Sequence, residues 1–223
     1  MDCVILYGMD EKYFDDLIEY FHSLDHITTD DIPNIDLYMD QVTGFMDQHL
    51  EPIKRHHEDK ALTKTMINNY AKNKLLPPPD RKRYNREHML ILLFIYYYKG
   101  ILQLNDIEVI LRPLTEKYFS GHPSVTLTDI YDEVFTMEPD EKKRIFAEVE
   151  NMARISLSSF SKENPKFSEL AEEDRSELQL FSFLCELGLD VFMKKLLMEK
   201  IADRLHEAEL ARQAQERAMK KKK

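Results

Sequence analysis

The stretch "LTKTMINNYAKNKLLPPPDRKRYNREH" (residues 62–88) decides how the middle of this chain folds. Pro77 disfavours helical geometry in the residue before it, so a helix that opens within "LTKT" must end by Leu76. The three consecutive prolines and the basic run after them fit neither a helix nor a central strand, which predicts an extended, exposed projection. Asn85 predicts the cap of a new helix, with Glu87 in its first turn, where the helix dipole favours negative charge.

The composition predicts a mostly α protein. The chain has 223 residues with only five glycines and no tryptophan, and residues that lose little on entering a helix replace them. The longest apolar run, "MLILLFIYYY", would span roughly 15 Å as a helix, half of a hydrocarbon core, so it predicts a buried helix. Further helices are expected over 12–24, over 36–48, after a Thr63 cap, after an Asn105–Glu108 capping box, over 128–137, from Pro139, and from 169 to the end. The 36–48 helix would bury one face made of Tyr38, Val42, Phe45 and Met46.

The charge is distributed unevenly along the chain. Residues 1–59 carry 15 acidic and 3 basic side chains, whereas residues 60–100 carry 9 basic and 2 acidic ones, in a chain of net charge -10. This basic island predicts an anionic partner. The start of the chain has no positive lead-in to an apolar run, and Cys3 and Cys185 form no disulfide framework, so we expect a cytoplasmic protein.

The island separates into two faces when it is placed on a helical wheel. Met66, Ile67 and Tyr70 fall together and would point into a core. The opposite face has cations, amides and a hydroxyl, which suit the base edges in a DNA major groove. The basic projection would hold the backbone beside that groove. The predicted DNA contacts are therefore Lys64, Thr65, Asn68, Asn69 and Lys72 in the groove, with Arg81, Lys82, Arg83 and Arg86 on the backbone.

A polar helix, a proline stop, a basic projection and a capped apolar helix follow one another in the order of a winged helix-turn-helix, in which a short β wing is possible. Over about residues 36–114 the sequence resembles the DNA-binding domain of MerR-type transcription regulators, most sharply at its Leu-Leu-Pro-Pro junction. The whole chain also resembles a bacterial family known only as a domain of unknown function, with a MerR-like half before a helical half. The residues that carry the resemblance are Ile67, Tyr70, Leu75, Leu76, Pro77, Pro78, Tyr84, Phe94, Ile95, Leu104, Asp106 and Ile107.

The resemblance implies a DNA-binding transcription regulator with three regions. These are an amphipathic helix and linker (1–33), a MerR-like winged helix-turn-helix domain (34–119), and a helical regulatory or dimerisation region with a long C-terminal helix (120–223). The sequence departs from the pattern at Asn68, where those regulators usually carry arginine, and in its shorter wing. A protein-interaction adaptor that retains the fold without binding DNA is therefore the alternative.

The C-terminal tail offers a narrow apolar seam of Leu197, Ile201, Leu205 and Ala208. MerR-type proteins dimerise through a long C-terminal helix, so the resemblance implies a homodimer; a frayed tail is the other interpretation. We expect no enzyme, because the chain lacks a P-loop, a dinucleotide-binding glycine motif and a nucleophile elbow. His22 and His26 are four residues apart on a helix, as metal-binding pairs can be, but they have no third ligand at matching spacing. The adjacent residues from His56 to Asp59 cannot point the same way on a helix and predict a polar loop, so we expect neither a metal nor a cofactor. A small-molecule sensor in the helical half is a third, weaker possibility.

Overall fold

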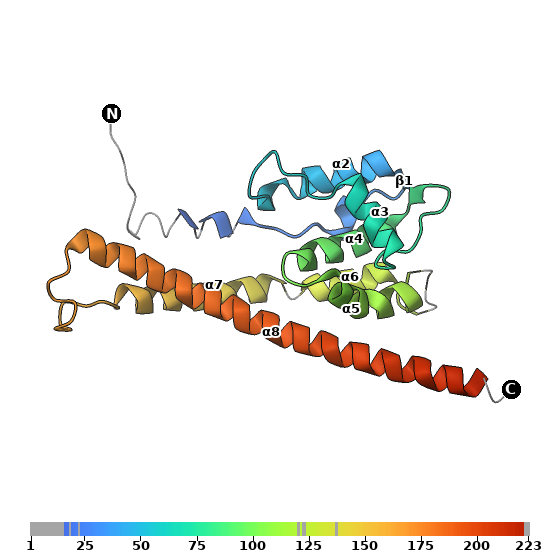
Figure 1. The fold of residues 1–223 in the computed structure, drawn as a ribbon. Helices are drawn as coiled ribbons and strands as arrows, with labels where there is room; N and C mark the ends of the chain where they lie inside the picture. Colours follow the sequence, from blue (N-terminus) through green and yellow to red (C-terminus); the bar gives the residue numbers. More distant parts are fainter. Residues whose placement is uncertain are drawn as a thin grey trace. The chain divides into compact units, whose positions relative to one another are not determined.

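A computed structural model describes residues 16–17, 19–21, 23–119, 121, 124–136 and 138–220. This part of the chain is mostly helical, with one small two-stranded sheet (Figure 1), which confirms the predicted fold class. None of its helices combines the length and the apolar character needed to cross a bilayer. The elements are η1 (Thr29–Asp31), β1 (Leu37–Tyr38), α2 (Met39–His49), η2 (Glu51–Ile53), α3 (Lys64–Lys72), β2 (Arg83–Tyr84), α4 (Arg86–Lys99), α5 (Leu104–Lys117), α6 (Leu127–Thr136), α7 (Glu138–Leu157) and α8 (Glu172–Lys220).

The chain divides into two compact units, each assembled from two separate segments. One unit takes its described residues from 26–136 and 195–223, and the other from 1–25 and 137–194. The single helix α8 therefore contributes to both. This division differs from the three consecutive regions expected from the sequence, because contacts between distant segments decide which residues share a core.

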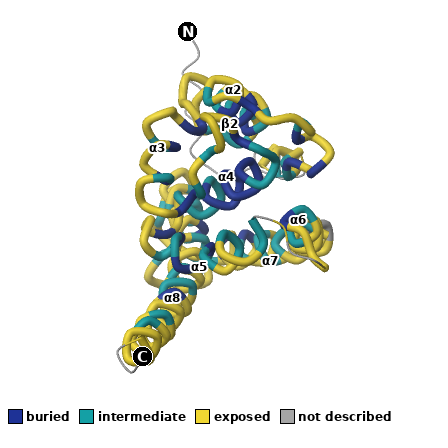
Figure 2. Tube along the Cα trace, turned by 90° about the vertical axis from the view of Figure 1, so that its right-hand side faces the viewer, coloured by how far each residue is buried: buried dark blue, intermediate teal, exposed yellow. Residues whose placement is uncertain are grey.

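The first unit is built around α4. Residues 89–95 are all buried, as expected for the central apolar run, and a helix that is apolar on every side is stable only inside a core. Helices α2, α3, α5 and α6 contribute the surrounding buried residues (Figure 2). In α2, Val42, Phe45 and Met46 are buried as predicted, but Tyr38 is 55 % exposed because it lies in β1, ahead of the helix.

The segment before β1 belongs to this same core. The Tyr131 hydroxyl donates to the carbonyl oxygen of Ile27 over 2.7 Å, and the Thr29 hydroxyl donates to Asp132 over 2.9 Å. Ile32 is buried as well. Residues on both sides of the expected 34–119 domain thus complete its core, since α6 covers α4 and η1 packs on α6.

Local sequence signals set most of the helix ends. The Thr63 hydroxyl accepts the amide of Met66 over 3.2 Å, so the predicted cap of α3 is confirmed. Asn85 caps α4 in the same way, and α4 ends at Lys99 before Gly100. The predicted Asn105–Glu108 capping box is wrong: α5 begins at Leu104, with Gln103 in the capping position. Glu108 instead accepts two hydrogen bonds from Arg112, one turn later, at 3.0 and 2.6 Å.

The second unit contains α7 and the first part of α8. Arg175 in α8 is almost fully buried and donates to the carbonyl oxygens of Phe167 and Leu170 at 3.0 and 3.3 Å, which holds the connector between the two helices in place. The inward face of α8 carries Phe183 and Leu187, which line an apolar pocket with α7. Of the expected helix over 12–24, residues 16, 17, 19–21 and 23 are helical. The remainder, except for Leu24, lies outside the described residues.

The tail of α8 packs in the first unit through a face that only partly overlaps the one predicted. Ala202 is buried and Met198 packs against the core, while Arg112 of α5 forms an ion pair with Glu209 at 3.2 Å. Of the predicted seam, Leu197 and Ile201 stay exposed. Leu205 and Ala208 are also exposed overall, but they line a groove with Val109 and Pro113 of α5, so the seam is used in part within the described residues of this unit.

Candidate nucleic-acid interface

The five groove residues predicted on α3 share one exposed face. Ile67 and Tyr70 are buried, and Met66 packs against the core, as the helical wheel predicts. These inward side chains cannot leave the core without exposing apolar surface, so they fix the direction of the opposite face of the helix. The residues exposed on that opposite face are Lys64, Thr65, Asn68, Asn69 and Lys72.

The basic projection after α3 is a tight turn with an unusual backbone. The amide of Arg83 donates to the carbonyl oxygen of Asp80 over 2.7 Å, which closes the turn. Arg81 and Lys82, its two central residues, have φ values of 45° and 66°. Two consecutive residues with positive φ define a type I′ turn, which normally uses Asn-Gly or Asp-Gly. Here the turn instead presents two cations to solvent, at some cost in backbone strain.

The small sheet brings the turn to the start of α2. Arg83 in β2 pairs with Tyr38 in β1, and Tyr38 is also the N-cap residue of α2. In the first turn of α2, Asp40 forms an ion pair with Lys64, the first residue of α3. The start of α3 and the basic turn therefore lie at the same end of this unit (Figure 1). Helix N-termini carry partial positive charge, so this end of the unit favours an anion.

Arg86, the ninth predicted contact, has a different position. It is only partly exposed, and its guanidinium donates to the backbone carbonyl oxygen of Thr29. This side chain joins the start of α4 to η1 and is not directed at the basic turn. We therefore leave Arg86 out of the interface and retain the other eight residues.

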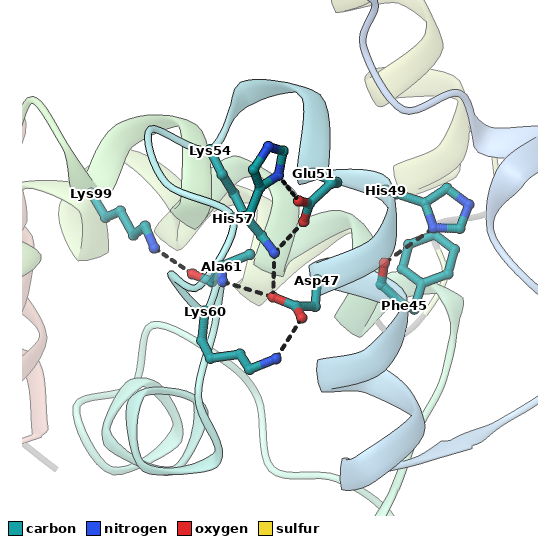
Figure 3. Close-up of polar contacts among 9 residues, drawn as sticks. All are labelled: Phe45, Asp47, His49, Glu51, Lys54, His57, Lys60, Ala61 and Lys99. Atoms are coloured by element: carbon teal, nitrogen blue, oxygen red, sulfur yellow. Dashed lines mark hydrogen bonds and ion pairs between the residues drawn. The ribbon is translucent and has the colours of Figure 1, made fainter.

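A cluster of ionic contacts holds the loop between α2 and α3 (Figure 3). The Lys54 ammonium, whose side chain is 3 % exposed, lies 2.8 Å from Asp47 and 2.5 Å from Glu51. Asp47 also accepts from Lys60 at 2.8 Å and from the amide of Ala61 at 3.3 Å. Because these donors stabilise its anion, Lys54 above all, the pKa of Asp47 is lowered. These contacts hold the residues just before α3 in place and so determine where α3 begins.

The same loop carries His56 and His57. His57 is exposed and pairs with Glu51, its Nδ1 lying 2.6 Å from the carboxylate. Within the described ranges, the structure gathers no three His, Cys, Asp or Glu side chains that could hold a metal ion. At the far side of the loop, Lys99 donates to the carbonyl oxygen of Ala61 at 2.5 Å, and burial lowers its pKa.

His88 supports the prolines that precede the turn. It is buried in the first turn of α4, where its Nδ1 lies 3.1 Å from the backbone nitrogen of Asn85 and also contacts the side-chain oxygen of Asn85. Burial lowers the pKa of His88, and the nearby carbonyl oxygens of Pro77 and Pro78 oppose that shift in part. The ring thus packs the start of the projection against α4 in its neutral form.

Two exposed residues near the predicted contacts were missed in the sequence. Lys74 is exposed directly after α3 with a φ of 62°, and it adds a cation beside Lys72. Its place within the basic island is the signal that could have identified it. Tyr38 is exposed beside Arg83, and no local pattern predicts this position because it results from pairing between β1 and β2.

The comparisons with known proteins give one match. Residues 27–134 match the model of a family described as a domain of unknown function (DUF1836). The matched range runs from Ile27, which accepts the Tyr131 hydrogen bond, to Val134 in α6. It agrees with the segment 26–136 of the first unit better than with the region 34–119 expected from the sequence. Neither the curated proteins nor the solved structures gave a match to the chain.

Proposed function

We propose that this protein binds double-stranded DNA through α3 and the Asp80–Arg83 turn, as a transcription regulator. The observation that carries this proposal is the exposed face of α3, which presents cations, amides and a hydroxyl while its other face is held in the core. A nine-residue helix is about 13 Å long, a length that suits a major groove roughly 12 Å wide. The resemblance to MerR-type regulators supports a winged helix-turn-helix arrangement and a homodimer.

The chemistry of the face suits this task. Asn68 and Asn69 can each pair with an adenine edge, and Lys72 can reach guanine or phosphate. Arg81 and Lys82 extend from the turn, where they can neutralise phosphates on the neighbouring strand. The acidic segments elsewhere in the chain would repel DNA and so orient the molecule.

The test is the salt dependence of DNA binding, measured by fluorescence anisotropy with genomic DNA fragments that were selected for binding to the protein. Five phosphate contacts predict that log affinity falls against log salt with a slope near -4.5. Replacing Arg81, Lys82 and Arg83 with alanine should flatten the slope by about two to three units. The matched control replaces three exposed lysines of the other unit, Lys143, Lys162 and Lys166, and should leave the slope unchanged. An unchanged slope in the first variant would remove the turn from the interface.

The alternative is a protein-interaction adaptor, and one observation favours it. Lys64 already has a carboxylate partner in Asp40, and the exposed apolar side chain of Tyr38 lies beside Arg83 of the basic turn in the sheet. Such a mixture of apolar and charged groups also suits a protein surface. An adaptor would give no mobility shift with random genomic fragments at micromolar protein and low salt, whereas a DNA-binding protein would be retarded.

A further inference from the structure

An apolar cavity of about 230 Å³ lies between α7 and α8 in the second unit. Phe146 and Val149 of α7 line it on one side, and Phe183 and Leu187 of α8 line it on the other. Phe183 is only 4 % exposed, so the cavity reaches into the core of this unit.

The helical residues ahead of α7 form the third side of the cavity. Leu17, Tyr20 and Phe21 complete its lining. Leu17 and Tyr20 are exposed, so they lie where the cavity meets solvent. Lys142 of α7 donates to Asp25 over 3.0 Å, and this contact holds the segment against α7. A small molecule can therefore enter from solvent past Leu17 and Tyr20.

Polar contacts outside the cavity fix the spacing of α7 and α8. The side-chain amide of Gln179, one turn before Phe183, donates to the carbonyl oxygens of Leu157 and Ser159 over 2.7 and 3.1 Å. The two helices cannot close over the cavity without breaking these hydrogen bonds. An apolar cavity lowers stability in proportion to its volume, because its lining lacks contacts on one side. A ligand that fills it would therefore stabilise the fold.

We propose that this cavity binds a small neutral molecule with an aromatic ring. None of the described residues that line it is charged, and the hydroxyl of Tyr20 is the only polar side-chain group among them. An ion would lose its hydration in the cavity without gaining a partner. Four of the seven lining residues are aromatic, and contacts between rings stabilise a complex beyond the apolar area that they cover.

The volume of the cavity sets the size of the ligand. An apolar cavity of roughly 150 Å³ holds one benzene molecule. The same ratio of volume to atoms gives about nine non-hydrogen atoms for the cavity between α7 and α8. Propylbenzene matches that number and has no polar group. This inference goes beyond DNA binding and concerns only residues of the second unit.

The experiment is equilibrium dialysis of the full chain against propylbenzene, together with thermal unfolding in its presence. We expect a dissociation constant below about 1 mM and a higher unfolding midpoint with the ligand. Benzoate has the same number of non-hydrogen atoms but carries a charge, so it should bind at least about tenfold more weakly. No binding of propylbenzene, or equal binding of the two compounds, would overturn the proposal.

A substitution that fills the cavity tests where the ligand binds. Val149→Phe should weaken propylbenzene binding at least about tenfold. The matched control is Val191→Phe, the same change at an exposed position of α8 that does not line the cavity, and its affinity should be unchanged. Far-UV circular dichroism shows whether each variant is folded. If Val149→Phe does not fold, Val149→Thr keeps the volume of the side chain and should also weaken binding, because it adds a hydroxyl to the apolar lining.

Two outcomes with these variants would contradict the proposal. One is unchanged binding in a folded Val149 variant, and the other is a loss of binding in Val191→Phe. The dialysis is also repeated at about 5 and about 100 µM of the chain, and the two affinities should agree. Weaker binding at the higher concentration would show that a second copy of the chain covers the cavity. No DNA is present in these measurements, so their failure is distinguishable from a failure of DNA binding.

Discussion

The strained turn at Arg81 and Lys82 gives the sharpest prediction. Both residues have positive φ, and a side chain in this conformation costs about 1–2 kcal/mol per residue. Asn-Gly adopts the type I′ turn readily, although the added glycine gains roughly 0.5–1 kcal/mol of entropy in the unfolded chain. The double replacement Arg81→Asn with Lys82→Gly should therefore stabilise the fold by about 1 kcal/mol.

The same replacement should weaken DNA binding. It removes two of five cations, so the slope of log affinity against log salt should change from about -4.5 to about -2.7. In urea, a gain of about 1 kcal/mol raises the unfolding midpoint by roughly 0.5 M. Stability and DNA binding should thus move in opposite directions, which is the behaviour expected when strain is retained at a functional site.

The control separates charge from backbone strain. Arg81→Gln with Lys82→Gln removes both charges but leaves two non-glycine residues with positive φ. The slope of log affinity against log salt should therefore flatten to about -2.7, while the free energy of unfolding stays unchanged. If the Arg81→Asn, Lys82→Gly variant unfolds at the same urea concentration as the unmodified protein, the turn is not strained in solution. If that variant is stabilised but its salt slope is unchanged, the turn does not contact phosphate.

Three further predictions concern single residues. Asp40→Asn should tighten DNA binding up to about fivefold at low salt, because it frees Lys64 for phosphate and an exposed ion pair is worth at most about 1 kcal/mol. Anisotropy titrations measure the affinity, and weaker binding by the variant would contradict the prediction. Thr63→Ala should lower the free energy of unfolding by about 1 kcal/mol through loss of the α3 cap, while Thr63→Ser should retain most of it in urea denaturation. Burial lowers the pKa of His88 from 6.5, so the unfolded chain binds more protons near and below that pH. Stability should then fall as the pH drops below about 6.5, by at most about 1.4 kcal/mol per unit. His88→Gln should reduce this dependence, and an unchanged profile would show that another group causes it.

The sequence alone determined the features that depend on neighbouring residues. Thr63 and Asn85 cap their helices through hydrogen bonds to amides three residues later, so their own side chains suffice to predict α3 and α4. Pro77 required α3 to end by Leu76, and the helix stops within that limit at Lys72. The proline run also predicted the projection after it, since fixed φ angles act locally. Helical periodicity also separated the buried and exposed faces of α3, because that spacing follows from the helix itself.

Only the tertiary structure decided the features that depend on distant segments. Arg86 carries a charge like its neighbours in the basic island, yet it binds a carbonyl 57 residues away. Similarly, Tyr38 fits a helical stripe but pairs with Arg83 in a sheet. The tail of α8 turns Met198 and Ala202 toward the core, and only Leu205 and Ala208 of the predicted seam lie against α5. In each case the outcome depends on which surfaces exclude water together, and that is a property of the packed chain and not of a local pattern.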